Sequence, residues 1–88
     1  MLIMPKIEKR LTFMGETALY CDFTHNGQKY FADLTPLPDI GIMTECMIFP
    51  YKKGKIDFCN GLYCRRNIPV TKELFISCIK EFIEELKE

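Results

Sequence analysis

Two aspartates are the residues of this sequence whose spacing could support acid–base chemistry. Asp22 and Asp33 lie in neighbouring apolar runs that we expect to pair as strands, which makes them diagonal neighbours on one sheet face. Two carboxylates that flank a substrate can act as general acid and base, but only in a cleft that separates their pKa values. An open sheet face in a small domain offers no such cleft. We therefore expect solvated carboxylates or part of a protein-binding surface, and we predict that the protein is not an enzyme.

The thiols and the single imidazole form no recognisable catalytic or metal motif. Structural zinc sites usually carry two knuckles of closely spaced Cys or His, whereas Cys59 and Cys64 form one loose pair without a second. His25, the only histidine, falls beside a predicted turn, where it cannot activate a thiol nucleophile. We predict no metal, no cofactor and no small-molecule substrate, and we expect buried or half-exposed thiols. The five cysteines are Cys21, Cys46, Cys59, Cys64 and Cys78.

The segment 51–66 interleaves aromatic and basic residues and has a local net charge of +4. Aromatic rings beside cations are typical of surfaces that grip single-stranded nucleic acid. The same residues could dock to an acidic protein surface, or could be an ordinary solvated turn. The residues of this possible patch are Tyr51, Lys52, Lys53, Lys55, Tyr63, Arg65 and Arg66.

Composition limits the class of protein. The chain has 88 residues, of which 48% are hydrophobic and 27% charged, and this predicts one globular domain over residues 1–88. Its 12 basic and 12 acidic side chains give zero net charge, which excludes a nonspecific polyanion binder and leaves local patches open. The odd number of cysteines and the lack of an export signal predict reduced thiols and a cytoplasmic location. No apolar run is long enough for a membrane span.

The clearest predicted element is a hairpin of strands 19–24 and 29–34. Asn26 and Gly27 between them are the strongest signal for a two-residue type I′ turn, because both central residues need positive φ. This turn places Phe23 opposite Tyr30, and with it one apolar face along the hairpin. The other face carries Tyr20, Asp22, Phe31 and Asp33.

Further strands are expected on both sides of this hairpin. Burial favours a preceding strand at 7–14 that places Phe13 opposite Leu19 and Leu11 opposite Cys21 after a three-residue loop. Residues 35–42 are read as a crossing loop rich in Pro and Gly. A strand at 43–50, a turn at 52–55 and one or two short strands within 56–59 and 62–65 follow.

The last segment predicts an amphipathic helix. Thr71 is a favourable N-cap, and Val70 can pack on Phe75 across the first turn. The apolar residues fill an arc of about 200°, wider than contact with one sheet requires, so Ile76 and Ile83 at its edge could contact a second copy or a partner. These residues are Leu74, Phe75, Ile76, Cys78, Ile79, Phe82, Ile83 and Leu86.

These elements predict an α+β fold, an antiparallel four- or five-stranded meander sheet with one C-terminal amphipathic helix packed on one face. One helix covers one face, so the other face is free to bind. We therefore predict a small non-enzymatic cytoplasmic protein of the interaction, adaptor or inhibitor type. It would bind a macromolecular partner, or a second copy of itself as a homodimer, through the open sheet face that carries Tyr20, Asp22, Phe31 and Asp33. The alternative is a module for single-stranded nucleic acid that uses segment 51–66.

Overall fold

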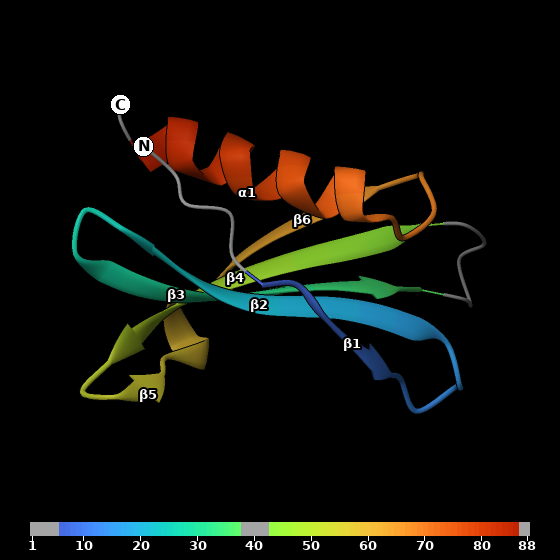
Figure 1. Ribbon diagram of the computed structural model, residues 1–88, viewed down its shortest axis with the longest axis horizontal. Helices are drawn as coiled ribbons and strands as arrows, with labels where there is room; N and C mark the ends of the chain where they lie inside the picture. The colour runs from blue at the N-terminus through green and yellow to red at the C-terminus, as the bar shows by residue number, and fades with distance from the viewer. Residues whose placement is uncertain (1–5, 38–42, 87–88) are drawn as a thin grey trace.

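A computed structural model describes residues 6–37 and 43–86 of the chain (Figure 1). Strands β1 to β5 are hydrogen-bonded in chain order within one antiparallel sheet, and β6 pairs with β4 beside β5. The elements are β1 (Glu8–Leu11), β2 (Thr17–His25), β3 (Gln28–Pro36), β4 (Thr44–Lys52), β5 (Lys55–Ile56), the 3₁₀ helix η2 (Phe58–Asn60), β6 (Leu62–Arg66) and α1 (Lys72–Leu86). The predicted α+β meander with one C-terminal helix is confirmed.

The central hairpin has the predicted register. Phe23 lies opposite Tyr30, and their rings stack with centroids 5.2 Å apart. Asn26 and Gly27 have φ values of 51° and 81°, as a type I′ turn requires. The strands are longer than predicted, and β3 continues into the first two residues of the expected loop at 35–42. Residues 38–42 of that loop lie outside the described residues.

The predicted register of β1 is wrong. Lys9, not Phe13, lies opposite Leu19, and Leu11 lies opposite Thr17. The strand ends at Leu11, and Phe13 beyond it is fully exposed. The predicted register would have buried more apolar side chains. The observed register instead places Arg10 opposite Ala18, and from there its guanidinium reaches the carboxylate of Asp33. An ion pair with a buried aspartate replaces the expected apolar contact.

The segment after β4 contains both short strands and a helical turn. Lys53 and Gly54 have φ values of 53° and 79° and form the predicted turn. The sequence predicts Cys59 at the end of a short strand, but it lies in η2. Asp57 caps this helix by accepting a hydrogen bond from the Cys59 N–H at 3.1 Å. This chain segment leaves the sheet and then returns to it as β6.

The helix covers one face of the sheet (Figure 1). The Leu74 N–H donates to Thr71 Oγ1 at 3.1 Å, which confirms the predicted N-cap. Phe82 packs edge-on against Phe23 and Tyr30, with ring centroids 6.1 and 5.1 Å away. The buried core between the two layers comprises Leu19, Cys21, Phe23, Ala32, Leu34, Cys46, Ile48, Phe75, Cys78, Ile79, Phe82 and Ile83.

Candidate functional site

The face of the sheet opposite α1 is partly covered by the chain itself. In Figure 1, β5 and η2 lie on the side of the sheet away from α1. Phe49 of β4 points to this side and is only 4% exposed, because the rings of Phe58 and Tyr63 pack edge-on against it at 5.0 and 5.7 Å. Gly61 passes so close to the ring of Phe49 that no side chain fits there. This cover closes the part of the face nearest β5 and β6.

The opposite part of this face is closed by an ion pair. Arg10 lies across Ala18 and binds both carboxylate oxygens of Asp33, with N···O distances of 2.8 to 3.0 Å. Asp33 is only 4% exposed. Burial raises the pKa of the Asp33 carboxyl, while the hydrogen bonds and charge of Arg10 act in the opposite direction. Asp33 is therefore a buried, paired group and is not available at the surface.

Between these two covers the sheet is open. We call this region the open-face hollow; it has a volume of about 460 Å³. Tyr20 and Phe31 form its floor as a pair of half-buried rings with centroids 6.2 Å apart. Tyr51 and Ile56 border it on the side of β5, and Lys6 and Glu8 on the side of β1. The residues that line the hollow are Lys6, Glu8, Tyr20, Cys21, Asp22, Phe31, Tyr51 and Ile56.

The polar groups of the hollow bind one another. The Tyr51 hydroxyl donates to Asp22 Oδ1 at 2.7 Å, and Lys29 Nζ lies 3.7 Å from Asp22 Oδ2. The same ammonium lies 4.6 Å from the centre of the Tyr51 ring, in a cation–π contact. Partial burial and the bond to Asp22 raise the pKa of Tyr51 to about 12, so the phenol keeps its proton at neutral pH. The exposed carboxylate of Asp22 thus has a donor and a cation beside it.

The two aspartates of the predicted site bind different partners. The register makes them diagonal neighbours, as expected, but Asp33 binds Arg10 while Asp22 binds Tyr51 and Lys29. Each carboxylate has its own partners, and the open-face hollow carries only Asp22. The arrangement provides aromatic contact area beside one aspartate carboxylate that Tyr51 and Lys29 contact.

The basic and aromatic residues of segment 51–66 do not form one patch. Lys52 ends β4 and Lys55 begins β5 on either side of the turn, whereas Arg65 and Arg66 pair with the opposite end of β4. Eight residues of extended chain separate these ends by roughly 25 Å. Each arginine is also neutralised, since Arg65 Nε lies 3.1 Å from Glu45 and Arg66 Nη2 lies 2.5 Å from Glu81. The other members of the set are Tyr51 in β4, Lys53 in the turn and Tyr63 in β6.

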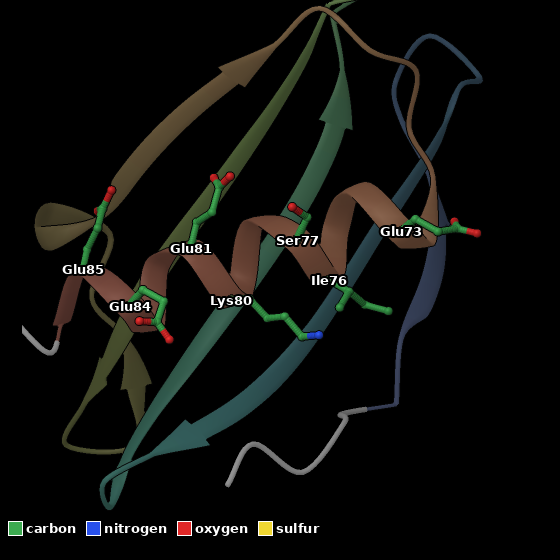
Figure 2. A pocket seen from close by; sticks show the side chains of 7 residues that line it. All are labelled: Glu73, Ile76, Ser77, Lys80, Glu81, Glu84 and Glu85. Atoms are coloured by element: carbon green, nitrogen blue, oxygen red, sulfur yellow. The ribbon is translucent and has the colours of Figure 1, made fainter.

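The helix edge offers less apolar surface than its sequence predicted. Ile83 is 7% exposed and belongs to the core, whereas Ile76 is half-buried and reaches the outside. Figure 2 shows Ile76 and Lys80 leaving the helix on one side and Glu81 on the other. A wide, open hollow of about 700 Å³ borders this outer surface, which is the charged face of an amphipathic helix. Its lining residues are Glu73, Ile76, Ser77, Lys80, Glu81, Glu84 and Glu85.

Sequence reasoning missed Arg10, Glu8 and Ile56 as parts of the sheet face opposite α1. Arg10 could have been found from the cost of burying Asp33, which demands a nearby cation. Ile56 could not, because the hollow depends on how β5 folds back beside β4. Sequence reasoning also missed a cluster of three thiols on the helix side, because its members come from three separate elements.

Comparison with models of protein families, with curated proteins and with solved structures finds no match for this chain. Within residues 6–37 and 43–86, no group of three or more His, Cys, Asp or Glu side chains is placed to hold a metal ion. In the same part of the chain, no helix has the length and apolar character needed to cross a membrane. The function has to be argued from the site itself.

Proposed function

We propose that this protein is a non-enzymatic interaction domain that binds a partner protein through the open-face hollow. The observation that carries the proposal is the half-buried pair of Tyr20 and Phe31, left uncovered between two covered parts of the same face. Exposed aromatic rings in a hollow are typical anchors of protein interfaces, where burial of their area supplies most of the binding free energy.

The occupant that fits best is an apolar or aromatic side chain of the partner. The charged groups around the rings are already engaged, because Asp22 binds Tyr51 and Lys29. An apolar anchor would therefore gain burial without stripping an unpaired charge of water. Lys6 and Glu8 at the rim also pair with each other at 3.6 Å, so this rim carries no net charge that would attract a polyanion.

Nucleic acid is a weaker candidate. Binding to single strands needs cations and rings along one groove, whereas Arg65 and Arg66 are paired with Glu45 and Glu81 at the far end of β4 from Lys52.

All five cysteines are free thiols, and this supports action in the cytoplasm.

The test is affinity capture from the native host with the full chain as bait. Tyr20→Ser and Phe31→Ser remove the two rings of the hollow, and Ile76→Ser is the matched control because it removes a half-buried apolar group from the other layer. We expect one or more proteins that bind the wild-type chain and the control but are lost from both ring variants, with or without nuclease. Circular dichroism first checks that each variant is folded.

Three outcomes would overturn the proposal. Capture that survives both ring substitutions would place the interface elsewhere. Capture that disappears with nuclease and weakens with salt would favour the nucleic-acid alternative. A twofold assembly in sedimentation, dissociated by Phe31→Ser, would make a second copy of the chain the occupant of the hollow.

A further inference from the structure

Three cysteines from three different elements meet on the helix side of the sheet, away from the open-face hollow. Cys46 of β4 lies directly opposite Cys64 of β6 in the antiparallel ladder. Cys78 of α1 lines the same small cavity as both of them. Cys46 and Cys78 are buried and Cys64 is half-buried, so Cys64 is the most exposed of the three.

A small cavity connects this cluster to the outside. It has a volume of about 170 Å³ between β4, β6 and α1, and all three cysteines line it. A molecule of liquid water occupies about 30 Å³, so the cavity has room for hydrogen peroxide. Arg66 also lines the cavity and bridges the layers, because one Nη donates to the Cys64 sulfur and the other binds Glu81 at 2.5 Å.

The charges around Cys78 favour its thiolate. The hydrogen bond from Cys46 and the charge of Arg66 lower the pKa of Cys78 to about 7, against the effects of burial and of Glu81. Donation of that bond raises the pKa of Cys46, which keeps its proton. Tyr63, Cys64 and Glu85 are the other titratable residues that line the cavity. These effects favour ionisation of Cys78 over ionisation of Cys46.

We propose that Cys78 reacts with hydrogen peroxide in this cavity and that Cys46 then forms a disulfide with it. The geometry carries the proposal, since Cys46 and Cys78 line one small cavity that has room for peroxide, and the guanidinium-bearing Arg66 lines the same cavity. The three thiols are not placed to share a metal ion, as no such group occurs in the described part of the chain.

The reaction balances in two steps. The Cys78 thiolate attacks one peroxide oxygen, so that an S–O bond forms, the O–O bond breaks, and the hydroxide takes up a proton to leave as water. The Cys46 sulfur then attacks the Cys78 sulfenic acid, an S–S bond forms, the S–O bond breaks, and the Cys46 proton leaves with hydroxide as a second water. Together, two thiols are oxidised by two electrons and one peroxide is reduced to two waters.

The test is peptide mapping after treatment with hydrogen peroxide. A Cys59→Ser chain is the reference, because Cys59 is the exposed thiol and would link two chains. Trypsin separates the three thiols into peptides 30–52, 56–65 and 73–80. We expect the intact mass to fall by two hydrogen atoms and peptides 30–52 and 73–80 to become linked, with reversal by dithiothreitol.

Single substitutions in that reference assign the roles. Cys46→Ser should leave a sulfenic acid on Cys78 that dimedone traps, and Cys64→Ser should still form the Cys46–Cys78 bond. Thiol loss at pH 7 should be about fivefold slower in Cys78→Ser. At this pH an ordinary thiol holds about fiftyfold less thiolate than Cys78, but its thiolate is about tenfold more nucleophilic. The proposal is overturned by a Cys46–Cys64 link in its place, by an unchanged rate in Cys78→Ser, or by thiols that stay reduced. None of these results bears on the open-face hollow, which lies on the other side of the sheet.

Discussion

Replacement of Arg10 by methionine isolates the contribution of its guanidinium to folding. The substitution keeps an apolar stem over Ala18 and leaves the carboxylate of Asp33, only 4% exposed, without its cation. Loss of one partner from a fully buried pair costs about 3–5 kcal/mol. The Arg10 side chain is 40% exposed, so solvent screening reduces the expected loss to about 2 kcal/mol. For a chain of this size that corresponds to a fall in Tm of about 8–16 °C.

The loss should depend on pH with a definite sign. Burial already raises the pKa of Asp33, and removal of Arg10 removes the two effects that lower it. A carboxyl whose pKa is higher in the folded state than in the unfolded state stabilises the fold at a pH below its unfolded-state pKa. This stabilisation is lost as the pH rises through the folded-state pKa. The deficit of Arg10→Met relative to wild type should therefore be larger at pH 7 than at pH 4.

Urea unfolding followed by circular dichroism at pH 4, 5.5 and 7 measures this deficit. The matched control is the double variant Arg10→Met/Asp33→Asn, which removes both charges and should recover most of the lost stability at pH 7. A deficit below about 0.5 kcal/mol at pH 7, or one that grows toward pH 4, would refute the argument that this ion pair sets the register of β1.

Three further substitutions test the packing. Gly61→Ala should cost about 1–3 kcal/mol in urea unfolding because the added methyl overlaps the ring of Phe49, and Phe49→Leu should relieve part of that loss; additive effects would contradict this contact. Thr71→Ala should lower the free energy of unfolding by about 1 kcal/mol through loss of the N-cap, while Thr71→Ser should retain it; equal losses in both variants would be evidence against the cap. Phe13→Ser should change stability by less than about 0.5 kcal/mol because Phe13 is fully exposed; a loss of about 3 kcal/mol would instead support the register in which this ring lies on the core face.

Local signals explain why most of the fold could be predicted. The Asn26–Gly27 turn determines which residues face each other along β2 and β3, and the periodicity after Thr71 determines the buried side of α1. In these elements turn chemistry, capping and apolar pattern agree with the final structure. The α+β class follows from them.

The errors arise where distant residues decide the structure. The register of β1 depends on Asp33, which is separated from Arg10 by 23 positions and needs a cation once it is buried. The burial of Ile83 depends on how the helix sits on the curved sheet, which its own periodicity does not report. The thiol cluster joins β4, β6 and α1, and no spacing of the cysteines in the sequence reveals that these elements meet.

The candidate site could be predicted only in part, because some of its contacts are local in the sequence and others join distant residues. Tyr20, Asp22 and Phe31 share one face because β2 and β3 form a local hairpin, and this could be predicted. The hollow itself depends on β5 and η2 closing one part of the face and on Arg10 closing another. These covers leave a bounded hollow on what would otherwise be an open sheet face.

Site-specific photo-cross-linking in the native host tests the central proposal most directly. A benzoylphenylalanine replaces Phe31 in the open-face hollow or, as the control, the half-buried Ile76 on the outside of α1. The account predicts a discrete protein adduct from position 31 that position 76 does not give. An adduct from position 76 with none from position 31 would contradict it and would move the interface to the helix.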